Sequence, residues 1–497
     1  MLDQQLNRVS MYRLLSITLT CLWGFATLLT LIGLLPYSPV AMIASATVLV
    51  ASSYGFNVLF GWLFSVKTHD ESSFITAMIL FFLFIPSADL AGLSALALVA
   101  MIAMGSKYVL AVRGRHIFNP AAIGAVIIGL LGVTYATWWI ATPVLTPVTL
   151  LFAFLILYKT RRLKLGLVFL TTAIPLIILV ALVNGQSLSS AITSIPSWPL
   201  LFLVGFMLSE PLTLPARKWQ RYVISAVVAI LFTVPFDIGI LSSTPAFALV
   251  IGNLVGFLLT QRRHLALVFK ERIQLSDSTE EYTFTTKQPI NYIPGQYMEM
   301  TIPHAHKDGR GVRRIFSIVG TPDESTIRFG IKMYDRPSSF KTALHDLKPG
   351  TIVTATGIGG DFILPKDTTT PLLLIAGGIG ITPFISHLLY LRKKNVATDI
   401  TLIYFVSTIK DLVYANTIKT SGIRVIVVTT DKNSLPDPNW ILHSAQRIAV
   451  HDITKYIPDI TTRSVFISGP PQMVDDMKHT VKQLHAKHIT CDYFTGY

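Results

Sequence analysis

The stretch that decides the fold of the C-terminal part is LLLIAGGIGITP, residues 372–383. Its apolar run predicts a buried strand, its glycines predict a tight turn, and Pro383 is typical of the first turn of a helix. Glycines at such a turn let a pyrophosphate approach backbone N–H groups at the helix N-terminus. A glycine turn alone is common, but strand, turn and helix follow one another here in the order that nucleotide binding requires.

Strands and helices alternate on the C-terminal side of this turn, which is typical of an α/β domain. On its N-terminal side, short β-type stretches are separated by Gly, Pro and Asp turns. We therefore predict an antiparallel β-barrel over residues 264–368 and an α/β nucleotide-binding domain over residues 369–497. The predicted strands are Tyr282–Thr286, Tyr297–Ile302, Ile327–Met333, Leu372–Ala376, Thr401–Val406, Val425–Thr429 and Val465–Ile467, and the predicted helices are Thr342–Leu347 and Pro383–Lys393.

A short pattern, Arg314-Ile315-Phe316-Ser317, stands at the end of a barrel strand. An arginine can hold a flavin phosphate through two hydrogen bonds. Phe316 projects from the same strand face and can stack on the flavin ring, while Ser317 offers a hydroxyl to the ring nitrogen that receives hydride. The following Ser338-Ser339 predicts a capped helix start that suits a diphosphate.

The order of these patterns resembles that of the ferredoxin–NADP reductase superfamily over about residues 266–497. The resemblance implies FAD and NAD(P)H as cofactors. It implies flavin contacts from Arg314, Phe316 and Ser317, with Ser338 and Ser339 near the phosphates. It implies nucleotide contacts from Gly377, Gly378, Gly380, Thr382 and Pro383, and a hydride-transfer site lined by Gly469, Pro470 and Pro471. The last residues, with Phe494 and Tyr497, resemble a terminal aromatic segment over the flavin face, and Ser317, Ser468 and Tyr497 are the candidate catalytic residues.

Some positions depart from the superfamily's pattern. Phe316 stands where a Tyr is commoner, Ser468 where many members have a Cys, and Lys341 where some members have a Ser. These departures leave the flavin interpretation in place but change the expected phosphate contacts. NADH and NADPH both stay open, because Lys410 could meet a 2′-phosphate whereas the neighbouring Asp411 would repel it.

The composition shows that much of the chain does not face water. Of its 497 residues, 52% are hydrophobic and only 14% are charged, against about 25% in a soluble domain. The mean hydropathy is +0.57. The net charge of +14 is explained by basic residues beside membrane helices, so it does not predict nucleic-acid binding. The two cysteines, Cys21 and Cys491, cannot supply the four thiolates of a typical iron–sulfur cluster.

Apolar segments over residues 1–263 predict a polytopic α-helical membrane domain of about ten helices. Basic residues occur in every second loop, and this alternation places the N-terminus and the reductase part in the cytoplasm of a cell with an inner membrane. The predicted spans lie near 11–35, 39–66, 73–88, 89–106, 120–134, 144–158, 164–184, 198–209, 221–236 and 243–261. The loop residues are Arg8 and Arg13, then Lys67, then Lys107, Arg113 and Arg115, then Lys159, Arg161, Arg162 and Lys164, then Arg217, Lys218 and Arg221, and finally Arg262 and Arg263.

Three polar patches, 70–76, 115–122 and 209–217, fall on the cytoplasmic side of these spans. With Asn119-Pro120-Ala121 and Glu210-Pro211-x-Thr213 they resemble one family of membrane proteins, found in the sodium-pumping NADH:quinone reductase and in the Rnf electron-transport complex. The resemblance implies a flavin-carrying electron carrier, with Asn119 and Thr213 as candidate cofactor contacts. The family's covalent FMN motif is missing, and Thr137 lies in the nearest fragment, so covalent attachment and a non-covalent FMN both stay open.

Two hypotheses follow. In the first, the chain is a membrane-bound NAD(P)H-dependent flavin oxidoreductase that passes electrons through FAD into the membrane domain and on to a quinone or an extracytoplasmic acceptor. Other electron-transport proteins are expected partners, and paired haem ligands are missing because no span holds a histidine. In the second, the membrane domain is a transporter or an anchor for a flavin or another small molecule, with a cytoplasmic reductase attached.

Overall fold

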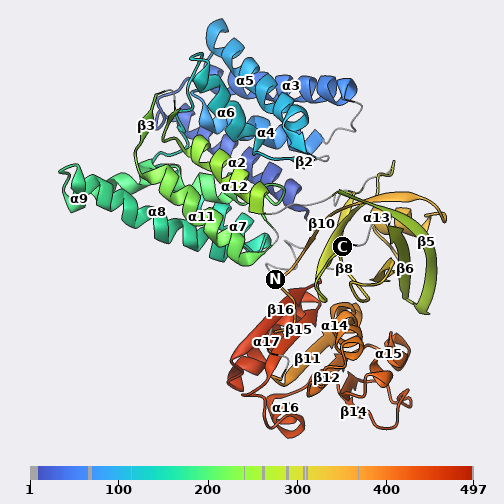
Figure 1. Ribbon diagram of the computed structural model, residues 1–497. Coiled ribbons are helices and arrows are strands. Elements are labelled where there is room, and N and C mark those ends of the chain that lie inside the picture. Colours follow the sequence, from blue (N-terminus) through green and yellow to red (C-terminus); the bar gives the residue numbers. More distant parts are fainter. Residues whose placement is uncertain are drawn as a thin grey trace. The chain divides into compact units, whose positions relative to one another are not determined.

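The computed structural model describes residues 9–64, 70–112, 115–215, 217–239, 241–259, 264–286, 290–305, 308, 312–365, 367 and 369–494. The chain divides into two compact units, Met1–Gln261 and Arg262–Tyr497, which we call unit 1 and unit 2 and describe separately (Figure 1). Several residues used above lie outside the described part of the chain, namely Arg8, Lys67, Arg113, Arg262, Arg263 and Tyr497.

Unit 1 is helical apart from two very short strand pairs. Several of its helices begin at side chains that accept hydrogen bonds from the first turn, namely Ser10, Ser38, Asp89 and Asn119. These bonds satisfy N–H groups that have no partner within the helix. The helices are α2 (Met11–Leu31), α3 (Pro39–Leu63), α4 (Asp70–Leu83), α5 (Leu90–Val109), α6 (Pro120–Leu130), α7 (Thr146–Lys159), α8 (Leu163–Val183), α9 (Leu188–Ser194), α10 (Leu200–Phe202), η2 (Leu203–Leu208), α11 (Lys218–Thr233) and α12 (Pro245–Leu259). The strand pairs are β1 (Ala111–Val112) with β2 (Arg115–His116), and β3 (Asp237–Ile238) with β4 (Leu241–Ser242).

Four helices of unit 1 are long and apolar enough to cross a membrane, namely α2, α3, α5 and α8. A fifth span arises if the bent pair 188–197 and 200–208 is counted as one, with a bend of 48°. Helices α6, α7 and α12 are apolar but shorter, so the prediction of ten spans is not confirmed. The four long helices indicate that unit 1 associates with a membrane.

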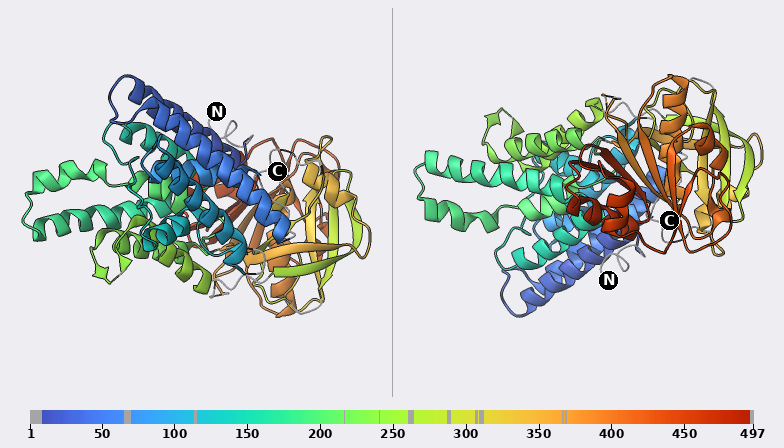
Figure 2. Two further views of the ribbon diagram at one scale, coloured as in Figure 1. Left: turned by 90° about the horizontal axis from the view of Figure 1, so that it is seen from above. Right: turned by 90° about the horizontal axis from the view of Figure 1, so that it is seen from below.

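The shorter helix α4 lies in the interior of unit 1. From Ile75 to Leu83 all of its side chains are buried, and it packs against α2, α3 and α6. Trp139 in the loop after α6 donates its indole N–H to the carbonyl of Phe81 at 2.7 Å. The long helix α2 packs mainly against α4 and α7, and α3 packs mainly against α4 and α5. Both helices, blue in Figure 2, expose apolar side chains such as Leu31 and Trp62, as expected of surfaces that face lipid.

Unit 2 begins with a six-stranded antiparallel sheet in the order β8-β7-β10-β5-β6-β9. Alternate residues such as Met298 and Met300 point into a core that also holds Phe284 and Phe329. The edge strands β8 and β9 meet at an isolated bridge between Val319 and Arg328, so full closure into a barrel stays a prediction. The strands are β5 (His264–Ser276), β6 (Thr279–Thr286), β7 (Tyr297–Thr301), β8 (Arg313–Ser317), β9 (Thr326–Lys332) and β10 (Ile352–Gly359), and helix α13 (Ser339–His345) precedes β10.

The second sheet of unit 2 is parallel, in the order β14-β13-β12-β11-β15-β16. Its central strand β11 contributes to two cores, because Leu372 and Leu374 pack on the side of α14 while Leu373 and Ile375 pack on the side of α17. This two-sided burial explains the continuous apolar run. The elements are β11 (Leu372–Gly377), α14 (Thr382–Lys393), β12 (Ile400–Phe405), η4 (Ile409–Asp411), α15 (Ala415–Thr420), β13 (Arg424–Thr429), β14 (Ile441–Ser444), α16 (Val450–Tyr456), β15 (Ser464–Gly469), α17 (Pro471–Gln483) and β16 (His488–Tyr493).

The predicted strands and helices of unit 2 agree with the observed ones to within three residues at either end. The largest shifts are of three residues. Strand β6 begins at Thr279 rather than Tyr282, and α13 begins at Ser339 rather than Thr342, because Ser338 caps the helix. Strands β5, β10, β14 and β16 and helices α15, α16 and α17 were not predicted. Strand order reverses at β11, since β12 follows it on one side and β15 lies on the other, and ligands bind at such points in open α/β sheets.

Candidate functional site

A cavity of about 1010 Å³ lies within unit 2, between the first sheet and the carboxyl ends of the parallel strands. This volume is at the upper end of the usual range for ligand pockets, about 300–1,000 Å³. The lining residues from the first sheet include Tyr297, Arg314, Phe316 and Ser317. Those from the second sheet include Gly377, Gly378, Ser407, Asp411, Thr429, Gln446, Pro470 and Phe494. The cavity therefore joins the two patterns on which the sequence interpretation depended.

The glycines in the turns after β11 and β15 are required for two different structural reasons, close packing and access to the cavity. A Cβ on Gly380 would lie 2.4 Å from the carbonyl oxygen of Ser468, and one on Gly377 would lie 2.5 Å from Cε of Met473. Gly469, at φ +153°, is equally close to Met473. These three glycines let the turns after β11 and β15 pack against each other. Gly378, at φ +52°, has nothing within 4 Å of a Cβ and lines the cavity, so it is the glycine placed to approach a ligand.

The flavin pattern lies on β8, where Ser317 pairs across the ladder with Tyr297 of β7. Ser317 is buried and lines the cavity. The ring of Phe316 contacts the rings of Phe340 and Phe329, with centroid distances of 5.9 and 6.0 Å. These contacts fix the orientation of a ring that also lines the cavity, so a planar ligand can stack on a rigid aromatic surface.

Arg314 is a buried cation with only 5% of its side chain exposed. Its Nη1 donates to the carbonyl of Arg313 at 2.6 Å, its guanidinium lies 5.2 Å from the centre of the Phe340 ring, and its Nη2 is 3.8 Å from a carboxylate oxygen of Asp308. Lys341 lies close by, donating from Nζ to the carbonyl of Lys332 at 2.6 Å. Two cations held in this way make one wall of the cavity positively charged.

Ser338 and Ser339 lie at the N-terminus of α13 but do not line the cavity. The Ser338 hydroxyl caps the helix by accepting from the backbone N–H of Lys341. The Ser339 hydroxyl accepts from the backbone N–H of Asp308 at 3.0 Å and contacts Nε2 of His304 at 2.9 Å. Both hydroxyls therefore have partners within the chain, and their predicted part in phosphate binding stays a prediction.

The predicted hydride-transfer segment lies at the switch point. The Ser468 hydroxyl is fully buried and has no hydrogen-bond partner among the described residues. Pro470 lines the cavity, as do Asp492, Tyr493 and Phe494 at the end of β16. The backbone N–H of Phe494 donates to the carbonyl of Gly469 at 2.8 Å. This bond ties the terminal segment to the turn, while Tyr497 lies outside the described residues.

Polar contacts join the two sheets of unit 2 and fix the width of the cavity. His387 of α14 contacts the carbonyls of Phe362 and Pro294 through Nε2, at 3.1 and 3.2 Å. Complete burial lowers the pKa of His387 to about 4, although both carbonyls oppose the shift, so the ring is neutral at pH 7. Tyr414, before α15, donates to the buried carboxylate of Glu281 on β6 at 2.9 Å.

Of the predicted site residues, the structure brings seven to the cavity wall: Arg314, Phe316, Ser317, Gly377, Gly378, Pro470 and Phe494. Thr382, Pro383 and Pro471 begin α14 and α17 behind the two turns and are not among the lining residues. Sequence reasoning missed Tyr297 and Glu299, although their alternation along β7 places them opposite Ser317 and Ile315. It also missed Thr429 and Gln446, whose only signal is that they follow strands.

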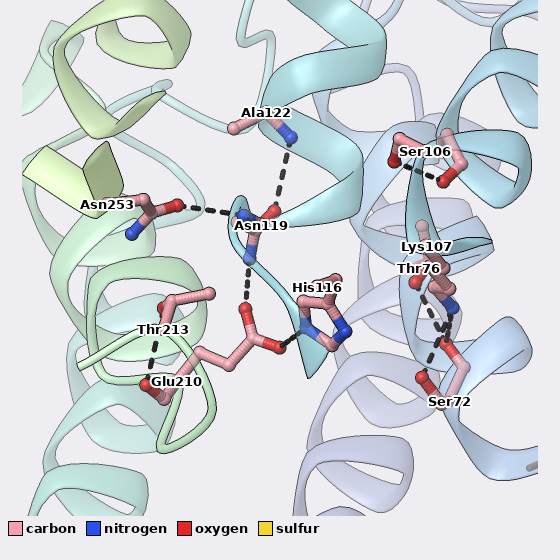
Figure 3. A network of polar contacts seen from close by, with 11 residues as sticks. Ser72, Thr76, Ser106, Lys107, His116, Asn119, Ala122, Glu210, Thr213 and Asn253 are labelled. Carbon is pink, nitrogen blue, oxygen red and sulfur yellow. Dashed lines mark hydrogen bonds and ion pairs between the residues drawn. The ribbon is translucent and has the colours of Figure 1, made fainter. Parts of the chain in front are cut away.

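In unit 1 the patches 115–122 and 209–217 meet in one polar network (Figure 3). Glu210 accepts from Nδ2 of Asn119 at 2.9 Å and contacts Nε2 of His116 at 3.1 Å. Asn119 caps α6, and its own backbone N–H donates to Oδ1 of the buried Asn253 on α12 at 2.8 Å. Thr213 donates to the carbonyl of Glu210 at 3.4 Å.

The patch 70–76 lies near this network and contacts helix α5 (Figure 3). Lys107 of α5 donates from Nζ to the carbonyl and the hydroxyl of Ser72, both at 3.1 Å. Asn119 and Thr213 line none of the cavities of about 1010, 580 and 160 Å³. Thr137 donates to the carbonyl of Leu83 at 3.3 Å. The predicted flavin contacts of unit 1 are thus engaged with the protein itself.

Comparison with known proteins gives a partial match. Residues 369–431 match the family described as the ferric reductase NAD binding domain. The chain is 26% identical to methane monooxygenase component C of Methylosinus trichosporium, over 31% of this chain and 46% of that protein. It is 27% identical to the 2-halobenzoate 1,2-dioxygenase electron transfer component of Burkholderia cepacia, over 41% of this chain and 59% of that protein. The chain thus spans about half of the length of these relatives.

Among solved structures, the cytochrome P450 reductase of Amycolatopsis is 23% identical, with a TM-score of 0.41 over 47% of this chain and 71% of that one. The C-terminal half of this chain is thus similar to reductase and electron-transfer proteins, and its residues 369–431 match an NAD-binding family.

Proposed function

We propose that this chain is a membrane-bound NAD(P)H-dependent flavin oxidoreductase. Electrons pass from cytoplasmic NAD(P)H through FAD in unit 2 into unit 1, and on to a quinone or an extracytoplasmic acceptor. The observation that carries the proposal is the cavity of about 1010 Å³ that Arg314, Phe316 and Ser317 share with Gly377, Gly378 and Pro470.

The donors around this cavity fit a flavin dinucleotide. The buried Arg314 and the nearby Lys341 offer cations for a diphosphate, and the braced ring of Phe316 offers a stacking surface. Bound FAD would accept hydride from NAD(P)H and release its electrons singly to an acceptor. The hydroxyl of Ser317 would be available to hydrogen-bond the bound ring, and Phe494 of the terminal segment would limit the access of water to the cavity.

The nucleotide side of the cavity fits NAD(P)H. Gly378 leaves open space in front of the turn after β11, and the N-terminus of α14 favours the negative charge of a pyrophosphate. Ser468 stands at the switch point, in the position that the superfamily resemblance gives to a residue beside the reacting carbon. Its hydroxyl is fully buried, has no hydrogen-bond partner among the described residues and lies behind the cavity lining.

Unit 1 would supply the next carrier. Its resemblance to the membrane proteins of the sodium-pumping NADH:quinone reductase and the Rnf complex supports a second flavin, an FMN in unit 1. An FMN near Asn119 and Thr213 would have to displace contacts that these residues make within the chain. The basic loops support an inner-membrane, multi-pass topology with the N-terminus and unit 2 in the cytoplasm. Tethering donor and acceptor in one chain raises their effective concentration. Other electron-transport proteins would be natural partners.

The test uses the purified full-length protein in lipid nanodiscs. Flavin is counted and identified by absorbance and mass, and NAD(P)H oxidation is followed with ferricyanide and with a water-soluble quinone. The proposal expects FAD in unit 2, about two flavins per chain, and quinone reduction that stops when Arg314 is changed to Ala. A single flavin with ferricyanide reduction but no electron transfer through unit 1 would favour a transporter or anchor with an attached reductase.

A further inference from the structure

One end of the cavity is lined by the carboxyl ends of β12, β13 and β14. Among the described residues, this end contains a single carboxylate, that of Asp411. Strands β12, β13 and β14 lie side by side beyond the glycine-turn strand β11. Their carboxyl ends contribute Ser407, Asp411, Thr429, Thr430 and Gln446 to the cavity wall. When a pyrophosphate lies at the turn after β11, an adenosine can extend over these strand ends, away from β15 and the flavin pattern.

Asp411 is held in place rather than free to turn away. It ends the short helix η4, and its backbone N–H donates to the carbonyl of Thr408 at 3.0 Å. One carboxylate oxygen accepts from the hydroxyl of Thr408 at 3.1 Å, and the other accepts from the hydroxyl of Ser278 at 3.3 Å. Each oxygen keeps further lone pairs for a ligand. The carboxylate is therefore a fixed negative charge at the cavity wall.

No cation faces this charge from the same end of the cavity among the described residues. Lys410 precedes Asp411, yet it is exposed and is not part of the lining. Arg447 follows the lining residue Gln446 and is likewise exposed and outside the lining. The other polar side chains at this end are neutral hydroxyls and one amide. A 2′-phosphate here would meet a carboxylate without an arginine or lysine to bind it.

We infer that Asp411 makes the enzyme selective for NADH over NADPH. The carboxylate accepts hydrogen bonds from the hydroxyls of an unmodified adenosine ribose and repels a 2′-phosphate. This inference rests on the proposed function, since it assumes that a nicotinamide nucleotide binds in this cavity. At a separation of about 4 Å the repulsion corresponds to a preference of roughly tenfold or more.

The first experiment measures binding without turnover, using full-length protein in nanodiscs. Calorimetric titrations compare the dissociation constants of NAD⁺ and NADP⁺, and of 5′-AMP and its 2′-phosphorylated form. We expect each 2′-phosphorylated ligand to bind roughly tenfold more weakly or worse. Equal or tighter binding of the phosphorylated ligands would overturn the inference. Absence of binding by all four ligands would overturn the inference and the proposed nucleotide site together.

The second experiment compares kcat/KM for NADH and NADPH with ferricyanide as acceptor. Asp411→Asn removes the charge but keeps the shape, so the NADH preference should fall roughly tenfold. The control variant Lys410→Ala should leave the preference unchanged, because it removes an exposed lysine that lies outside the cavity wall. An unchanged preference in Asp411→Asn, or a selective loss of NADPH activity in Lys410→Ala, would contradict the assignment.

Measuring both binding and turnover distinguishes failure of the proposed reductase function from failure of the proposed role of Asp411. If NAD⁺ binds with the expected preference but neither nucleotide is oxidised, the reductase proposal fails and the selectivity of the site stands. If both nucleotides are oxidised with NADPH preferred, the reductase proposal stands and the role of Asp411 fails. The melting temperature of Asp411→Asn shows whether the variant is folded, and Asp411→Ser provides a second neutral residue if it is not.

Discussion

Polar residues are used differently in the two units. In unit 2, Arg314 and Ser317 of β8 and the distant Asp411 line a shared cavity. In unit 1, His116 and Asn119 also meet a distant residue, Glu210, yet they bind it directly. The first arrangement leaves room for a ligand, whereas the second satisfies its own hydrogen bonds.

This difference shows that a polar patch in a sequence can be either a ligand site or a structural hydrogen-bond network. Only the contacts of its side chains in the folded protein distinguish the two. The Glu210 network ties the N-terminus of α6 to the segment after η2 and to α12. The segment η2 is a π-helix, which often marks functional positions in helices. The network therefore holds α6, α12 and the segment after η2 together. A role for it in electron transfer is part of the proposed function.

The largest expected effect comes from breaking the packing of the two turns in unit 2. Gly380→Ala forces a Cβ against the carbonyl of Ser468, and backbone cannot give way cheaply. We expect unit 2 to lose about 3 kcal/mol of stability. Gly378→Ala is the matched control, with open space around the Cβ, and should cost about 1 kcal/mol from its positive φ.

The chain's two cysteines allow each unit to be followed by itself, since Cys21 lies in unit 1 and Cys491 in unit 2. A dye on Cys491 in a Cys21→Ser chain reports the melting of unit 2. Equal melting temperatures for Gly380→Ala and Gly378→Ala would contradict the packing account of the glycines.

Acid should weaken unit 2 through His387. Its pKa is about 4 in the folded state because of burial, against about 6.5 in an unfolded chain. The unfolded state therefore binds more protons between these values, and stability falls as the pH drops, by about 2 kcal/mol from pH 7 to pH 5. His387→Gln keeps a donor for the carbonyls and does not titrate, so it should flatten this part of the pH profile. An unchanged profile in that variant would show that another group causes the acid sensitivity.

A smaller effect is expected from the network of unit 1. Glu210→Gln removes the charge that faces His116 and Asn119, and should cost about 1 kcal/mol. Glu71→Gln is the control, because the ion pair of Glu71 with Arg13 is long, at 3.8 Å, and more exposed; it should cost no more than about 0.5 kcal/mol. The melting of unit 1 is followed by a dye on Cys21 in a Cys491→Ser chain. Loss of quinone reduction in Glu210→Gln without loss of stability would make the network a functional site.

The smallest expected effect is at the flavin wall. Phe316→Tyr adds the hydroxyl that is commoner at this position in the superfamily, on a ring that already lines the cavity. One added hydrogen bond should tighten flavin binding about threefold. The measurement is the dissociation constant of FAD in the reconstituted protein, with Phe340→Tyr as control, since Phe340 is fully buried. Weaker flavin binding in Phe316→Tyr would indicate that the ring does not face the flavin.

Local patterns explain how much of unit 2 could be predicted. The run of residues 372–383 carries its strand, turn and helix start in adjacent positions, and the structure places all three there. Tyr297 was not assigned to the cavity, because its pairing with Ser317 across two strands brings it there, and that pairing does not follow from neighbouring residues. The sequence could not show why position 380 must be glycine. The backbone of Ser468, which leaves no room for a Cβ there, is far away along the chain.

Unit 1 was less predictable for a physical reason. Apolar composition indicates helices, but helix length and burial decide which of them cross a membrane. The interior helix α4 and the short α6 are as apolar as the long helices. The contact between Asn119 and Glu210 joins residues 91 positions apart, so the sequence could name both patches without showing that they meet.

The most direct test of the central claim is an anaerobic titration of the full-length protein with NADH, followed by flavin absorbance. The account predicts that one equivalent of NADH bleaches the FAD of unit 2. It also predicts that Arg314→Ala, which removes the buried cation of the cavity, loses both the FAD and the bleaching. Persistent flavin absorbance in the presence of excess NADH and NADPH, or full bleaching in Arg314→Ala, would contradict the account.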